Sequence, residues 1–306
     1  MDTVADIVQH ACAEQEVSEE LLQVARTNPQ ALEPFHRQLF DAELHWPWLL
    51  YDHASEEFAA YVAQQAQDDP RLLSLLAATQ TLTAVQAFKN WASIEPDKPW
   101  HTWTHAGGWE LTGLGTKRSL GFSEGFQLVP GGTMGEQIEQ ACGWCGMKLW
   151  KILDLDLADP TYAPLGLPAA GRITVAMCLR CVCYAPAFLS YDGTGGVAWH
   201  ESNVRPEYNG NDDDEWDAPE SGMSLGEPLP PGSWCDPWHA GGSVLGGRPD
   251  WIQDNDFQAC PACGQTMTFF GAITGTDLYD DDLSEGCYYL MADPVCRVST
   301  VVYQQS

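Results

Sequence analysis

Cysteine pairs with the spacing Cys-x-x-Cys are the residues of this chain that point most directly to chemistry. Cys142 and Cys145 form one pair, Cys178 and Cys181 form a second, and strand-like residues separate them. A Cys-x-x-Cys turn holds two thiolates a few ångströms apart, and two such turns together form a tetrahedral cage for zinc. The sequence therefore predicts a structural Zn²⁺ site at these four cysteines. A catalytic zinc needs an open coordination position, and this pattern offers none.

The second half of the chain repeats this arrangement. Ala259-Cys260-Pro-Ala-Cys263-Gly corresponds to Ala141-Cys142-Gly-Trp-Cys145-Gly, and strand-like residues again lead to a final cysteine. The repeat contains one exchange, because Asp293 stands where the first module has a cysteine. A carboxylate oxygen is also a zinc ligand. The second predicted metal site therefore comprises Cys260, Cys263, Asp293 and Cys296.

Two alternatives to this second site stay open at this point. In one, Cys287 or His239 completes the ligand set in place of the carboxylate. In the other, the second module has lost its metal and keeps its fold by packing alone.

The elements that must position these ligands fall into three predicted regions. Residues 1–94 read as helical, with Ser18, Ser55 and Asp69 as N-caps. The cap at Asp69 is expected to open one helix that continues to Phe88. Glycine and tryptophan crowd together after Ile94 and predict short strands with tight turns. We therefore expect an α+β protein: a helical region (1–94), a first β-rich zinc-knuckle module (95–205) and an acidic second module (206–306).

The net charge of −29 excludes several classes of partner. A surface that binds nucleic-acid phosphates needs Lys and Arg, and an anionic lipid surface would repel this chain. Between Glu207 and Asp293 there are eighteen acidic residues and one basic residue, Arg248. This imbalance favours a basic protein partner over the alternative that the charge serves solubility alone. The predicted contact residues are the two densest runs: Asp212, Asp213, Asp214 and Glu215, and Asp280, Asp281 and Asp282.

The start of the chain has no basic segment followed by an apolar one, and no run of about 18 apolar residues occurs. We therefore expect a cytoplasmic protein, in which paired cysteines indicate metal rather than disulfides. His101 and His105 could transfer protons, but no paired carboxylate or nucleophile accompanies them in the sequence.

A stretch near the second cysteine pair resembles a known family. The residues that carry the resemblance are Leu245-Gly-Gly-Arg-Pro249-Asp-Trp251, then Cys260-Pro-Ala-Cys263-Gly, then Met267 to Phe270. They resemble the bacterial family of unknown function typified by YwqG. They are also similar to the eukaryotic ribosomal-protein chaperones of the programmed-cell-death-protein-two kind. The match covers residues 238–306, is looser over 105–190, and departs from the pattern at Asp293. The resemblance implies a duplicated β-rich fold and a protein-binding role.

Together these features predict a non-enzymatic binding protein that masks a basic partner. In bacteria such a protein could be the immunity protein of a secreted antibacterial toxin, because toxins that act on nucleic acid often present basic clefts. One alternative is a chaperone for a basic ribosomal protein, as the resemblance implies. A second is a zinc-dependent enzyme that uses the Trp- and His-rich region.

Overall fold

A computed structural model describes residues 3–67, 69–207, 218–279 and 285–306. The chain forms two compact units, Met1–Ser119 and Leu120–Ser306. The first is mainly helical and the second is built from antiparallel sheets, so the expected α+β class is confirmed. The acidic runs at 212–215 and 280–282 lie outside the described residues.

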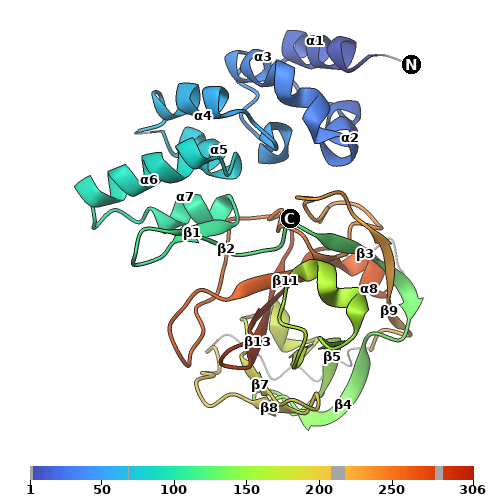
Figure 1. Cartoon of the computed structure of the whole chain (residues 1–306). Helices are drawn as coiled ribbons and strands as arrows, with labels where there is room; N and C mark the ends of the chain where they lie inside the picture. Colours follow the sequence, from blue (N-terminus) through green and yellow to red (C-terminus); the bar gives the residue numbers. More distant parts are fainter. Residues whose placement is uncertain (1–2, 68, 208–217, 280–284) are drawn as a thin grey trace. The chain divides into compact units, whose positions relative to one another are not determined.

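Short amphipathic helices make up most of the first unit (Figure 1). Ser18, Ser55 and Asp69 each accept a backbone N–H at a helix start, as predicted. The helices are α1 (Val4–Glu14), α2 (Glu19–Thr27), η1 (Pro29–Phe35), α3 (His36–Asp41), η2 (Trp48–Tyr51), α4 (Glu56–Ala63), α5 (Pro70–Ala78), α6 (Leu82–Ile94) and α7 (His101–Ala106).

The single helix predicted from Asp69 to Phe88 is wrong. Helix α5 ends at Ala78, Gln80 takes a left-handed conformation with φ of 53°, and α6 begins at Leu82. The Thr81 hydroxyl accepts the N–H of Ala84 at 3.1 Å and so caps the new helix. The chain therefore turns where the periodicity alone suggests continuity.

The first unit extends to Ser119, past the predicted boundary at residue 94. Helix α7 packs on α5, and the hairpin of β1 (Trp109–Leu111) and β2 (Lys117–Ser119) follows it. Trp109 is fully buried and its indole N–H donates to the Ala77 carbonyl at 2.8 Å. Gly107 is required beside it, because an added Cβ would lie 2.4 Å from the same carbonyl oxygen.

Within its described residues, the second unit is built from two antiparallel sheets. The larger has eight strands in the order β8-β7-β13-β12-β11-β10-β3-β9, and the smaller has the order β4-β5-β6. Their strands are β3 (Gly125–Gly132), β4 (Glu136–Ala141), β5 (Lys148–Asp156), β6 (Arg172–Met177), β7 (Leu189–Tyr191), β8 (Val197–Trp199), β9 (Gly222–Pro228), β10 (Val244–Gly246), β11 (Thr268–Thr274), β12 (Cys287–Asp293) and β13 (Val298–Gln304). The described part of this unit also contains three short helices: η3 (Pro160–Leu165), η4 (Cys181–Cys183) and α8 (Gly275–Tyr279).

The large sheet joins segments from both predicted β-rich modules. Strand β3 pairs with β10, and β7 pairs with β13, so strands on either side of residue 205 share one hydrogen-bonded ladder. The two halves therefore form one compact unit rather than separate modules.

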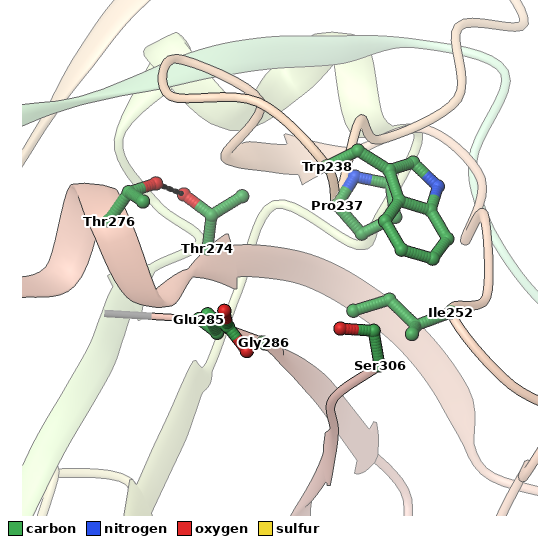
Figure 2. Close-up of a pocket in the computed structure, with 8 residues that line it drawn as sticks. All are labelled: Pro237, Trp238, Ile252, Thr274, Thr276, Glu285, Gly286 and Ser306. Atoms are coloured by element: carbon green, nitrogen blue, oxygen red, sulfur yellow. Dashed lines mark hydrogen bonds between the residues drawn. The ribbon is translucent and has the colours of Figure 1, made fainter. Parts of the chain in front are cut away.

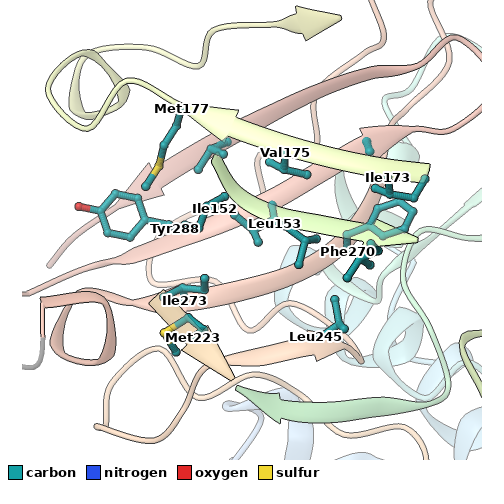
Figure 3. Packing of buried hydrophobic residues seen from close by; sticks show 14 of the residues in the cluster. Ile152, Leu153, Ile173, Val175, Met177, Met223, Leu245, Phe270, Ile273 and Tyr288 are labelled. Carbon is teal, nitrogen blue, oxygen red and sulfur yellow. The ribbon is translucent and has the colours of Figure 1, made fainter. Parts of the chain in front are cut away.

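Side chains of the large sheet alternate between two hydrophobic clusters. Phe270, Tyr288 and Leu290 pack against Ile152 and Val175 of the small sheet (Figure 3). The intervening residues of the same strands face a second cluster on the other side, which contains Phe269, Tyr289, Met291 and Trp251. Because strand residues point alternately to opposite faces, burial on both faces explains the uninterrupted apolar run of β12.

Among the described residues, no helix has the length and apolar character needed to cross a membrane.

Candidate metal centres

The four cysteines of the first predicted site lie at one end of the hairpin formed by β5 and β6. Cys142 and Cys145 occupy the turn between β4 and β5, and Cys178 and Cys181 follow β6. In the first turn the N–H of Cys142 donates to the Met147 carbonyl at 2.7 Å, and the N–H of Gly146 donates back to Cys142 at 2.9 Å. Gly146 has φ of 80°, a left-handed conformation that glycine adopts without steric cost.

The four sulfur atoms have the spacing of a tetrahedral site. Their atoms all lie within 4.8 Å of one another. The Sγ–Sγ distances are 3.8 Å between Cys142 and Cys181 and 3.4 Å between Cys145 and Cys178. Zinc–thiolate bonds of about 2.3 Å in a tetrahedron require sulfur separations of about 3.8 Å. The group could therefore hold a metal ion of this size with little rearrangement.

The surroundings of this first centre suit bound thiolates. Cys142, Cys178 and Cys181 are buried, and Cys145 is half-buried. The N–H of Trp144 donates to Cys142 Sγ and the N–H of Cys181 donates to Cys178 Sγ, both at 3.4 Å. The Cys178 thiol lowers the pKa of Cys142, but Cys181 and burial raise it more, to a net value of about 12. A metal ion that binds here must therefore displace protons from the thiols.

The second group repeats the first turn almost bond for bond. The N–H of Cys260 donates to the Gln265 carbonyl at 2.8 Å, and the N–H of Gly264 donates to Cys260 at 2.7 Å. Gly264 has φ of 76°. The strands that follow are β11 and β12, in place of β5 and β6.

Asp293 occupies the position of Cys178 in this second group. Its Oδ1 accepts the N–H groups of Val295 and Cys296 at 2.9 and 3.0 Å, which leaves Oδ2 directed at the cysteines. Oδ2 lies 3.2 Å from Cys263 Sγ, and the four ligand atoms lie within 4.8 Å of one another. Burial raises the pKa of Asp293, but the hydrogen bond from Cys296 and the nearby thiols outweigh it and lower the pKa to about 2. The carboxylate therefore stays ionised and available as a ligand.

The structure thus brings together all eight predicted ligands in two groups and leaves both alternative ligands outside them. Cys287 lies at the far end of β12, where it pairs with Thr274 and is buried in a hydrophobic cluster. His239 pairs with Asp236, with 3.0 Å between Nδ1 and Oδ2. The second group is more accessible than the first, because Cys263 is exposed and Cys296 is half-buried.

In the histidine-rich region of the first unit, a histidine lies beside a carboxylate. His105 Nε2 lies 3.5 Å from Glu110, and Glu110 also pairs with Arg118 at 2.8 Å. His101 lies beside His105, with 5.5 Å between ring centroids. Within the described residues these two histidines are not part of any cluster with metal-ligand spacing.

The sequence did not indicate one buried feature, at the end of β11 that lies away from the second group. Asp277 is buried in α8 and its carboxylate accepts the N–H of Gly241 at 2.7 Å and the hydroxyl of Ser243 at 2.5 Å. These two hydrogen bonds hold the loop that carries Trp238 and His239. The sequence signal for Asp277 is an acidic residue within an apolar stretch. This signal is weak here because the chain contains many other acidic residues.

Comparison with known proteins finds similarity to an uncharacterized bacterial protein. An uncharacterized protein named YpfL from Salmonella typhimurium (strain LT2) is 26% identical over an alignment of 322 positions, which covers 96% of this chain and 73% of that protein. No family model matches the chain, and no solved structure matches it. The similarity extends through both units.

Proposed function

We propose that this chain is a cytoplasmic, non-enzymatic binding protein that masks a basic protein partner, with zinc in both metal centres. Each group already supplies four protein ligands, which is the composition of a structural zinc site. Each also ties the ends of a central hairpin of the second unit. Zinc here stabilises the scaffold that presents the binding surface.

The observation that carries this proposal is the buried position of Arg248, the one basic residue between Glu207 and Asp293. Arg248 is only 7% exposed. Its guanidinium lies over the Trp234 ring, 4.4 Å from the centroid, and donates to the Gly232 carbonyl. Its charge is therefore directed inward, while Glu220, Glu227 and Asp254 of the same stretch remain exposed. A basic protein would meet acidic groups without a competing cation from this stretch.

Other cations of the second unit are also held by neighbouring groups. Lys151 pairs with Glu136 at 2.6 Å and with Asp154 at 3.0 Å, and Arg172 pairs with Asp154 at 2.6 Å. Arg180 is buried. The resulting negative field would attract a basic partner chiefly by raising the rate of association.

Among basic partners, we propose a secreted antibacterial toxin, which makes this chain its immunity protein. An acidic protein that fills the basic cleft of such a toxin would block access of its nucleic-acid substrate. The resemblance to ribosomal-protein chaperones favours a second candidate, in which the partner is a newly made ribosomal protein.

Affinity purification of the tagged chain from its native host, followed by mass spectrometry, tests the proposal. We expect one basic protein to be enriched. The same purification is carried out with a control variant in which four exposed acidic residues of the first unit are changed to glutamine: Glu14, Glu16, Glu33 and Glu57. Growth protection against the recovered protein supports the toxin, and a ribosomal protein supports the chaperone. Enrichment of acidic or neutral proteins alone would contradict the proposal.

A further inference from the structure

A small pocket lies at the end of the large sheet that is opposite the second metal group. Figure 2 shows Thr274 and Thr276 on one side and Pro237, Trp238 and Ile252 on the other. Glu285 also lines it, at the start of the segment leading into β12. The cavity volume is about 250 Å³. Pockets for small-molecule ligands usually enclose about 300–1,000 Å³, so this one suits a single side chain.

The wall that carries Trp238 is fixed before any ligand arrives. The Asp236 carboxylate accepts the N–H of Trp238 at 3.3 Å, and the N–H of Asp236 donates to Gly242 at 3.2 Å. Buried Asp277 then anchors the same loop through Gly241 and Ser243. The indole remains 46% exposed despite these restraints. The ring therefore presents an aromatic face on which a planar group of a ligand can stack.

The opposite wall is polar and equally well held. Thr274 Oγ1 accepts the N–H of Asp277 at 3.2 Å, and the hydroxyls of Thr274 and Thr276 lie 3.0 Å apart. These oxygens can accept hydrogen bonds. Among the residues that line the pocket, Glu285 carries the one charged side chain. An anion such as phosphate would find no cation there.

We propose that this pocket receives an arginine side chain of the basic partner, with the guanidinium over the Trp238 ring and beside the Glu285 carboxylate. This inference rests on the proposed function and deepens it. A guanidinium is planar, stacks on aromatic faces, and has five donors that could reach the carboxylate and the threonine hydroxyls. Lysine offers a more strongly hydrated point charge and fits the same site less well.

The first test uses short peptides, so it does not depend on identifying the partner. The full chain is labelled with 5-fluorotryptophan, and the Trp238 signal is assigned by its absence in Trp238→Phe. Acetyl-Gly-Arg-Gly-amide is then titrated against the same peptide with Lys, Gln or Glu at the centre. We expect a saturable shift with arginine, a weaker one with lysine and none with glutamine. A shift with glutamine equal to that with arginine, or no shift with arginine, overturns the proposal.

One variant tests the contribution of the charged side chain in the pocket. Glu285→Gln is expected to weaken binding of the arginine peptide about two- to fivefold, the range for a solvent-accessible ion pair. Glu227→Gln is the matched control, because Glu227 is exposed in the same unit and does not line the pocket. Equal affinities of wild type and Glu285→Gln would contradict the assigned charge contact.

A second test distinguishes failure of this inference from failure of the proposed function. The recovered basic partner is titrated with wild type, with Trp238→Leu combined with Glu285→Gln, and with the control Trp46→Leu, which changes an exposed tryptophan of the first unit. We expect at least about tenfold weaker binding for the double variant alone. Unchanged binding refutes the pocket and leaves the masking function intact. Absence of a basic partner refutes the masking function, while the peptide titration still decides the pocket.

Discussion

His36 should make the stability of the first unit depend on pH. Its side chain is 1% exposed and lies against Tyr51 and Phe58, with 5.5 Å between its ring centroid and each of theirs. Burial lowers the pKa of His36 to about 4, while the Leu50 backbone and the Asp52 carboxylate raise it by smaller amounts. The imidazole is therefore neutral in the folded chain at every pH well above 4.

The size of the effect follows from the two pKa values. An unfolded histidine has a pKa of about 6.5. Because the folded pKa is lower, the stabilisation is present above about pH 6.5 and is lost as the pH falls toward 4. With a folded pKa of about 4, the free energy of unfolding at pH 5 should be about 2 kcal/mol lower than at pH 7.5.

Urea unfolding of wild type and His36→Phe at pH 7.5, 6 and 5 measures this contribution. Far-UV circular dichroism follows the helices, which lie mainly in the first unit. Phenylalanine cannot be protonated, so the difference between the two proteins removes the titration of all groups that they share. We expect this difference to change by about 2 kcal/mol between pH 7.5 and 5, with wild type losing more. A difference that stays constant with pH, or changes in the opposite direction, would refute the reasoning.

Three further predictions concern the metal centres and the acidic runs. Cys145→Ser should lower bound zinc from two ions per chain toward one and destabilise the second unit, because structural zinc supplies folding free energy. Elemental analysis and thermal melting check this, with the exposed, non-ligand Cys183→Ser as control. Asp293→Cys should keep or tighten the second metal and Asp293→Ala should weaken it. If both leave zinc content and melting temperature unchanged, the carboxylate is no ligand. Neutralising residues 212–215 together should slow association with the partner and flatten its dependence on salt. Stopped-flow association rates across a salt series check this, and the measurement is repeated with residues 280–282 neutralised. If the salt dependence of both variants matched that of wild type, neither acidic run would contribute to association with the partner.

Local patterns predicted the metal groups well. The Cys-x-x-Cys turns are set by bonds within six residues, such as that from Cys260 to Gln265, so spacing alone predicts them. Asp293 followed from the internal repeat, since its position matches Cys178. The break between α5 and α6 was missed because Gln80 is a good helix former by propensity and Thr81 is only a mildly unfavourable one. The chain turns there through the left-handed conformation of Gln80 and the cap at Thr81.

Long-range pairing was beyond the reach of these patterns. Nothing local to Phe126 indicates that it pairs with Leu245, and this contact joins the two predicted modules in one sheet. The sequence likewise predicts strands where helix α7 begins at His101. This helix is stabilised by packing on α5 rather than by its own residues, so its sequence does not indicate it. The pocket was missed for the same reason, since its walls come from segments separated by tens of residues.

The hairpin of β11 and β12 places its metal group and the pocket at opposite ends. Near the metal group Thr268 pairs with Ala292, and at the far end Thr274 pairs with Cys287, so a strand of about 20 Å separates the two. If the proposed pocket binds the partner, substitutions around Thr276 or Glu285 would therefore alter recognition without disturbing the candidate metal ligands. Because the two ends are separate, residues around the proposed pocket could change as partners change. The cysteines at the other end would be conserved, because they hold the same metal group in each relative. Relatives that recognise different proteins should differ most around the pocket and least around the cysteines of the metal group.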